Sequence, residues 1–224
     1  MDTTKRLMVL ACALASFAAA PGVLAVESAS QARERRAKEV VDMANDGNKA
    51  LKDGNFDLAI EKFTGALDRG ISGDNKTVAV YGRGLAYFQK KDCPSAMKDF
   101  DQIVEQKATD AQFHFVRALC LVQAGDKPGA YASVDKAIAI APEKPEYYRF
   151  KCIDRFNAKD FTGALSDCEK TVSLTPDDAD IWLAIGQSAE LTNDKVKARG
   201  AYEKLLALKP DSQGAKDGLA RTAK

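Results

Sequence analysis

The chain has 224 residues, with 33 Lys and Arg against 32 Asp and Glu, a formal charge of +1 and a single His. A charge this close to neutral argues against a nucleic-acid-binding protein, which needs a basic excess to meet phosphates. An apolar fraction of 46% is typical of a globular protein rather than of a disordered chain or a multi-span membrane protein. With one His and no pair of Cys at zinc-finger spacing, we expect no metal site and no cofactor.

The first 25 residues have the features of a secretory signal peptide. Lys5 and Arg6 give a positive start, residues 7–20 are uncharged and mostly apolar, and residues 23–25 offer a cleavage position. The alternative is a retained membrane anchor, but residues 7–20 are too few for a transmembrane span, which takes about 20 residues. We therefore expect cleavage after Ala25, export to the periplasm or the medium, and a mature chain that does not span the membrane.

Polar segments flank the rest of the chain. Residues 28–39, SASQARERRAKE, have a helical composition and a high density of charge. A charged run of this kind is more often a solvated helix face than a binding site. We expect residues 26–39 to form a polar N-terminal helix that caps the fold, and residues 211–224 to form a capping helix at the other end.

A period of 34 residues organises the chain between the two caps. Pro142, Pro176 and Pro210 are 34 residues apart, and each follows an alanine by 12 residues. Three further columns recur, namely Gly47, Gly84, Ala118, Cys152 and Gly186; Ala59, Ala96, Ala130, Ala164 and Ala198; and Phe63, Phe100, Val134, Cys168 and Tyr202. The sequence therefore predicts five repeats, at residues 40–76, 77–110, 111–144, 145–178 and 179–210.

Each repeat is predicted to be a pair of antiparallel helices. Apolar residues recur at three- and four-residue steps, as Ile60, Phe63 and Leu67 do. Small residues at the columns of Gly47 and Ala59 let the two helices approach closely, and the closing prolines end the second helix. Such pairs have apolar faces that only stacking can bury, so we expect an all-α fold, a right-handed α-solenoid of five helix-turn-helix repeats.

These columns resemble the tetratricopeptide repeat family, whose pattern combines an aromatic residue, Leu-Gly, Tyr, Ala, a second aromatic residue and Pro. The fifth repeat is the most similar, with Trp182, Ile185-Gly186, Ala198, Tyr202 and Pro210. The resemblance spans about residues 40–210 and implies the solenoid fold of that family. The sequence departs from the family pattern at Ile71 and Ala108, where prolines are expected, and at Cys152, which replaces a small Gly or Ala.

A search for catalytic groups finds one imidazole, that of His114. It occupies the column that elsewhere holds Met43, Val80, Tyr148 and Trp182, and no Ser, Cys or carboxylate is placed as its catalytic partner. The carboxylates are scattered, so no pair typical of a glycosidase can be chosen. We expect His114 to be a core or edge residue and the protein not to be an enzyme.

Four cysteines follow the predicted leader, and export through an oxidising space would favour their pairing. Cys93 begins the second helix of one repeat, and Cys120 lies late in the first helix of the next, at a similar height in the stack. Cys152 and Cys168 lie in the two inward columns of one helix pair. We predict the pairs Cys93–Cys120 and Cys152–Cys168; the alternative is four buried thiols that act as small apolar residues.

In the tetratricopeptide repeat family the first helix of each pair lines a concave surface on which ligands lie, and the resemblance implies the same surface here. Helical spacing predicts that repeats two to four give it an apolar groove. The candidate groove residues are Tyr81, Leu85, Phe88, Phe115, Val116, Leu119, Arg149, Phe150, Ile153 and Phe156. Family members that grip a C-terminal carboxylate use Lys, Asn and Arg at fixed places, of which only Asn48 is present, so we do not expect that clamp.

An exposed apolar patch on a soluble protein usually marks a binding surface. The sequence therefore favours a non-enzymatic adaptor of the cell envelope, which binds a peptide or an amphipathic helix of another protein in this groove. The alternative is a structural homo-oligomer in which the same groove mediates self-association. A third possibility is a groove that the polar N-terminal helix of the chain itself covers.

Overall fold

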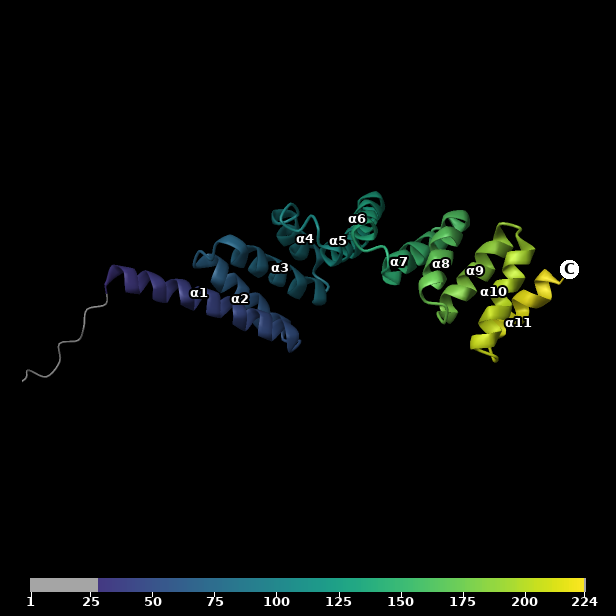
Figure 1. Cartoon of the computed structure of the whole chain (residues 1–224), viewed down its shortest axis with the longest axis horizontal. Coiled ribbons are helices and arrows are strands. Elements are labelled where there is room, and N and C mark those ends of the chain that lie inside the picture. The colour runs from purple at the N-terminus through teal and green to yellow at the C-terminus, as the bar shows by residue number, and fades with distance from the viewer. Residues whose placement is uncertain (1–27, 224) are drawn as a thin grey trace, which may run out of the picture.

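A computed structural model describes residues 28–223, and in this part of the chain eleven α-helices and no strands follow one another along an elongated molecule (Figure 1). The helices are α1 (Ala29–Lys52), α2 (Phe56–Asp68), α3 (Gly73–Gln89), α4 (Cys93–Gln102), α5 (Ala111–Gln123), α6 (Lys127–Ile140), α7 (Pro145–Asn157), α8 (Phe161–Leu174), α9 (Ala179–Leu191), α10 (Lys195–Leu208) and α11 (Gln213–Thr222). The predicted all-α repeat fold is confirmed. The predicted signal peptide, residues 1–25 with its cleavage site, lies outside the described residues.

The first ten helices form five successive pairs, from α1 with α2 to α9 with α10. The same turn joins the two helices of every pair. Its central residue has a positive φ, 64° at Lys91, Lys159 and Asn193, and a glycine fills this place in the other two pairs. The next residue caps the second helix by accepting a hydrogen bond from a backbone N–H three residues on. These caps are Asn55, Asp92, Asp126, Asp160 and Asp194.

Prolines end the second helix in repeats three to five. Helices α6, α8 and α10 stop at Ile140, Leu174 and Leu208, each two residues before its proline. The proline ring clashes with the preceding residue when that residue is helical, so the helix ends there. Repeat two has Ala108 in place of the proline. There α4 already stops at Gln102, and residues 103–110 are a series of turns.

The two inward columns of each repeat are matched in size. A Cβ atom added to Gly47 would lie 2.9 Å from the ring of Phe63, and one added to Gly84 would lie 2.6 Å from the ring of Phe100. In repeats where the first-helix residue is larger than glycine, the second-helix residue that it contacts is smaller than an aromatic ring. The pairs are Gly47 with Phe63, Gly84 with Phe100, Ala118 with Val134, Cys152 with Cys168, and Gly186 with Tyr202. These contacts are the physical reason for the small-residue column.

The two ends differ from each other. The expected N-terminal polar helix is not a separate element, since α1 runs without a break from Ala29 to Lys52. A capping box between Ser28 and Gln31 begins it. Its first ten residues are mostly exposed, and the helix packs against α2 and α3. At the other end α11 packs against α9 and α10, with Ala215 fully buried.

No helix within residues 28–223 is both long and apolar enough to cross a membrane.

Repeat three is stacked less closely on its neighbours than the other repeats are. The contacts of α4 with α5 and of α6 with α7 are less extensive than those of α2 with α3 or α8 with α9. Aromatic rings occupy the space between the first helices at these two junctions. The ring centroids of Tyr81 and Phe113 are 5.9 Å apart between α3 and α5, and those of Phe115 and Tyr147 are 4.9 Å apart between α5 and α7. These large side chains keep the backbones apart.

Candidate functional site

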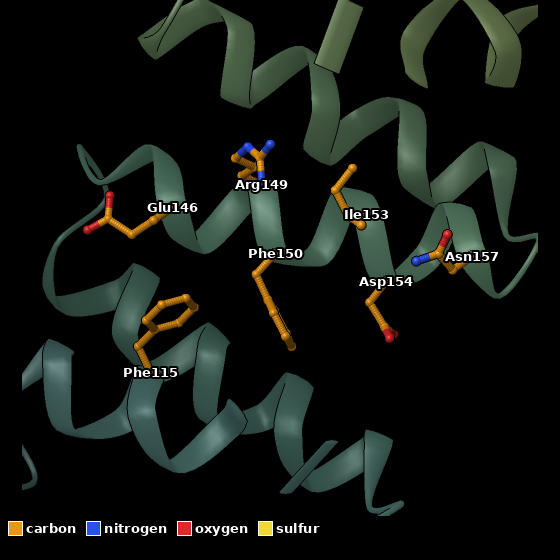
Figure 2. Close-up of a pocket in the computed structure, with 7 residues that line it drawn as sticks. All are labelled: Phe115, Glu146, Arg149, Phe150, Ile153, Asp154 and Asn157. Carbon is orange, nitrogen blue, oxygen red and sulfur yellow. The ribbon is translucent and has the colours of Figure 1, made fainter. Parts of the chain in front are cut away.

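The looser junction between α5 and α7 contains an open pocket of about 400 Å³ (Figure 2). It is lined by Phe115, Glu146, Arg149, Phe150, Ile153, Asp154 and Asn157. Four of these seven are among the residues that the sequence predicts for the groove. The other three, Glu146, Asp154 and Asn157, lie one turn before Phe150 and one and two turns after it on α7. Helical spacing of four and seven residues from Phe150 is the sequence signal that would have found them.

Two phenylalanines form the apolar part of the pocket. Phe150 points from α7 toward the preceding repeat, where the ring of Phe115 lies beside it (Figure 2). Their ring centroids are 5.9 Å apart and the rings are perpendicular, an edge-to-face contact that aromatic pairs favour. Phe115 also packs on the buried Tyr147. Phe115, Phe150 and Ile153 are half-buried, so the helices hold them in place while one side stays open.

Charged groups surround this apolar floor. The Nε atom of Arg149 donates to Asp178 at 2.9 Å, and its Nη2 atom is 3.8 Å from Asp180. Asp154 accepts hydrogen bonds from the hydroxyl of Tyr131 at 2.6 Å and from Lys127 at 3.3 Å. Carboxylates therefore already offset the positive charge of Arg149.

The exposed carboxylate of Glu146, in the first turn of α7, completes the rim of the pocket. Its negative charge is not offset by an ion pair within 4 Å in the described part of the chain. The rim consequently favours positive charge.

Val116 is not a groove residue, contrary to the prediction. Its exposure is 4%, and it belongs to the core cluster that contains Phe100, Phe113 and Cys120. Phe113, Val116 and Cys120 follow one another at steps of three and four residues, so they share the face of α5 that packs on repeat two. Phe115 lies on a different face, toward α7. The sequence places both faces on one helix but does not say which repeat each will meet.

The remaining predicted residues do not line the pocket between α5 and α7. Tyr81, Leu85 and Phe88 are half-buried and pack against the same core cluster as Val116. Leu119 is also half-buried. Phe156 lines a second pocket of about 380 Å³, together with Gln187, Glu190, Leu191 and Arg221. Five of the predicted groove residues thus line two separate pockets, one on each side of α7, whereas Tyr81, Leu85 and Phe88 pack in repeat two.

His114 is a core residue, as predicted. It is 2% exposed, and its ring packs edge-on against Phe113. Its Nε2 atom lies 3.0 Å from the carbonyl oxygen of Ala108. Because a carbonyl oxygen only accepts hydrogen bonds, Nε2 is the donor, and this bond ties α5 to the turn segment before it. No group of three or more His, Cys, Asp or Glu in residues 28–223 is arranged to hold a metal ion.

The structure pairs four cysteines as predicted, Cys93 with Cys120 and Cys152 with Cys168. The Cα atoms of Cys93 and Cys120 are 5.1 Å apart, and those of Cys152 and Cys168 are 5.0 Å apart, both in the range of disulfides. All four residues are buried. Cys93–Cys120 joins repeat two to repeat three, whereas Cys152–Cys168 lies within repeat four.

Comparison with known proteins agrees with this architecture. A family model described as tetratricopeptide repeat matches residues 46–111, 81–145 and 153–213. The chain belongs to the tetratricopeptide repeat family. Between residues 46 and 213 the matches leave out only residues 146–152, in the first half of α7, so they cover most of the helix pairs described above. No curated protein sequence matches the chain.

Solved structures of tetratricopeptide repeat proteins have the same fold. The chain is similar to the MamA protein, with a TM-score of 0.67 and 19% identity over 79% of this chain and 93% of MamA. It is also similar to YrrB, described as a tetratricopeptide repeat protein with an unusual peptide-binding site, with a TM-score of 0.69 and 18% identity over 86% and 98%. A C-terminal part of a repeat protein from Cytophaga hutchinsonii has a TM-score of 0.66 and 22% identity over 80% and 73%.

Proposed function

We propose that this tetratricopeptide repeat protein is a non-enzymatic adaptor that binds a peptide segment of another protein in the pocket between α5 and α7. The pair Phe115 and Phe150 carries the proposal: both rings are partly exposed in an open pocket, and covering them with an apolar group of a partner lowers the free energy. Helix α1 packs against α2 and α3 and does not cover this pocket. The peptide-binding site ascribed to YrrB supports the same use of this fold.

The rim of the pocket defines the chemistry of the peptide. A large apolar side chain would fill the space between Phe115, Phe150 and Ile153. A neighbouring Lys or Arg of the peptide would meet Glu146, while the two carboxylates around Arg149 leave no net positive charge there to repel it. We therefore expect a segment with an aromatic or aliphatic anchor next to a basic residue.

Random peptides displayed on phage test this proposal directly, with the mature chain from residue 26 as the bait. Apolar-basic sequences should be enriched, and Phe150→Asp should lower their affinity by about tenfold or more, as for a central anchor residue. Val196→Asp is the matched control, because Val196 is 86% exposed on α10 and away from the pocket. Equal binding by Phe150→Asp and the wild type would overturn the proposal.

A second variant tests the charge of the partner without disturbing the fold. Glu146→Lys replaces an exposed side chain on the rim. The variant should still select apolar anchors but lose the preference for neighbouring Lys and Arg. Light scattering of the bait addresses the alternative function: a concentration-dependent dimer that Phe150→Asp dissociates would assign the pocket to self-association instead.

We also propose that the protein acts outside the cytoplasm. The support is the leader pattern of residues 1–25 together with four later cysteines that lie in two bonding pairs. The intact mass of the protein isolated from an expressing bacterium should correspond to a chain that begins at Val26. A mass that retains residues 1–25 would contradict the proposal.

A further inference from the structure

The junction between repeats two and three has the features of a hinge. Helix α4 is shorter than the other second helices, and residues 103–110 connect it to α5 through turns. The contacts of α4 with α5, like those of α6 with α7, are less extensive than those of α2 with α3. The stability of a solenoid is roughly the sum of the stabilities of its repeats and of the contacts between neighbouring repeats, so a junction with few contacts is where it bends or opens first.

Besides an apolar core cluster that α3, α4 and α5 share, several specific contacts hold this junction. The rings of Phe100 and Phe113 meet edge-to-face with centroids 5.6 Å apart. The Nη2 atom of Arg117 lies 3.0 Å from Oδ1 of the exposed Asp101, an ion pair that water weakens. The third contact is the bond between Cys93 at the start of α4 and Cys120 near the end of α5.

The second cysteine pair has no comparable task. Cys152 and Cys168 join α7 to α8, two helices that already pack against each other along their length. If the Cys152–Cys168 bond were removed, the packing of α7 against α8 would still hold the repeats in the same arrangement. The two pairs therefore form a natural comparison within one chain.

We propose that the Cys93–Cys120 disulfide is a redox-sensitive clamp that fixes the orientation of repeats one and two relative to repeats three to five. A pocket of about 380 Å³ lies against the bond, lined by both cysteines with Met97 and Leu121 among its apolar walls, and is the route by which a small dithiol would approach the buried sulfurs. Reduction removes this covalent link, and noncovalent contacts, among them the His114–Ala108 hydrogen bond and the packing of the buried Ile103, then restrain residues 103–110 as the hinge. This inference does not depend on the peptide-binding proposal, since it concerns the angle between the two halves.

The reduction step is balanced with a dithiol as the co-reactant. One thiolate of the dithiol attacks a sulfur of the disulfide and displaces the other cysteine as a thiolate. The second thiol of the dithiol then attacks the mixed disulfide and releases the remaining cysteine. The protein disulfide gains two electrons and two protons and becomes two thiols, and the dithiol becomes a cyclic disulfide.

Hydrogen exchange of the mature protein, with and without dithiothreitol, tests the clamp. Reduction should raise the exchange rate of residues 103–110 and the adjoining ends of α4 and α5 by about tenfold. The Cys93→Ala/Cys120→Val variant, which keeps the site apolar, should show fast exchange without reductant. Cys152→Ala/Cys168→Val should exchange like the oxidised wild type over residues 103–110.

Small-angle scattering and thiol alkylation complete the test. The maximum dimension of the particle should change on reduction of the wild type and not on reduction of Cys93→Ala/Cys120→Val. Four alkylatable thiols in the native protein would overturn the proposal, as would an equal effect of the two double variants on residues 103–110. If Cys93→Ala/Cys120→Val fails to fold, reduction of Cys152→Ala/Cys168→Val gives the same comparison, because Cys93–Cys120 is then the remaining bond.

Discussion

The hydroxyl of Tyr131 on α6 donates a hydrogen bond of 2.6 Å to the Oδ2 atom of Asp154 on α7. This contact crosses the junction between repeats three and four at the rim of the pocket. Burial, and then the neighbouring Asp154 carboxylate, raises the pKa of Tyr131 to about 12, so the hydroxyl keeps its proton under all physiological conditions. The pocket thus has one wall held by a bond between repeats.

Tyr131→Phe should loosen this wall. The substitution removes the donor to a carboxylate while the ring and its packing stay in place, so we expect the free energy of unfolding to fall by about 1–2 kcal/mol. Chemical denaturation measures the change. Tyr148→Phe is the control: Tyr148 is half-buried on the same α7 helix and its hydroxyl has no hydrogen bond in the described structure. Equal effects of the two changes would show that the bond to Asp154 does not contribute.

Asp99→Ala should be among the most destabilising changes of a charged residue. Its side chain is 3% exposed and accepts two hydrogen bonds from Arg83, at 2.9 Å from Nε and 2.6 Å from Nη2. Loss of the carboxylate leaves a mostly buried guanidinium without its partner, for which we expect about 3–5 kcal/mol.

The matched control for Asp99→Ala is Glu203→Ala. Glu203 pairs with Arg199 at 3.1 Å, and both side chains are more than half exposed. Because water already solvates both charges, its removal should cost less than about 0.5 kcal/mol. Thermal unfolding of the two variants under the same conditions distinguishes the cases; a similar loss from both would contradict the role of burial.

The charge columns show that more could have been predicted from the sequence. Arg83, Arg117 and Lys151 are 34 residues apart, as are Asp101 and Asp135. In the structure Arg117 pairs with Asp101, and Lys151 pairs with Asp135 at 2.7 Å, so both pairs join a second helix to the next first helix. The charged residues of these ion pairs thus recur with the same spacing of 34 residues as the apolar columns. The period also predicted the helix pairs, the end of the second helix before each proline, and the cysteine partners, because each depends on spacing along a regular helix.

The shape of the groove depends on features that periodicity does not contain. Val116 and Phe115 are adjacent in sequence, yet one packs into repeat two and the other lines the pocket. The face of α5 that stays open depends on the distances between α3 and α5 and between α5 and α7, which the aromatic rings at the two junctions set. That separation results from side-chain packing between repeats with different residues in each copy, so an average repeat pattern cannot supply it.

Gly84→Ala should destabilise the fold although alanine favours helices. An added Cβ atom would lie 2.6 Å from the ring of Phe100 and 3.3 Å from the Cβ atom of Asp99, so α3 and α4 would have to move apart. We expect a loss of about 1–3 kcal/mol from this overpacking. Gly200→Ala is the control, because nothing lies within 4 Å of its added Cβ atom. There helix propensity alone should raise the stability by up to about 1 kcal/mol. Denaturant midpoints that move in the same direction for both would contradict this account of the glycine column.

The stability of the fold should decline between about pH 10 and pH 12. Burial is the first cause that raises the pKa of Tyr81, Tyr131 and Tyr202 from 10.0 to about 12, and hydrogen bonds to Asp154 and Glu190 add to it for the latter two. A group with a higher pKa in the folded state binds its proton more tightly there. Its contribution is therefore complete below pH 10 and is lost as the pH rises toward 12.

Denaturation series across this pH range, with the ultraviolet absorbance of tyrosinate recorded in parallel, measure the effect. Tyr202→Phe removes one of the three groups, together with its 2.8 Å hydrogen bond to Glu190. The variant should start from a lower stability at pH 8 and then lose less with rising pH, because one fewer shifted proton is released on unfolding. A pH slope equal to that of the wild type would mean that Tyr202 ionises as readily in the folded chain as in the unfolded one.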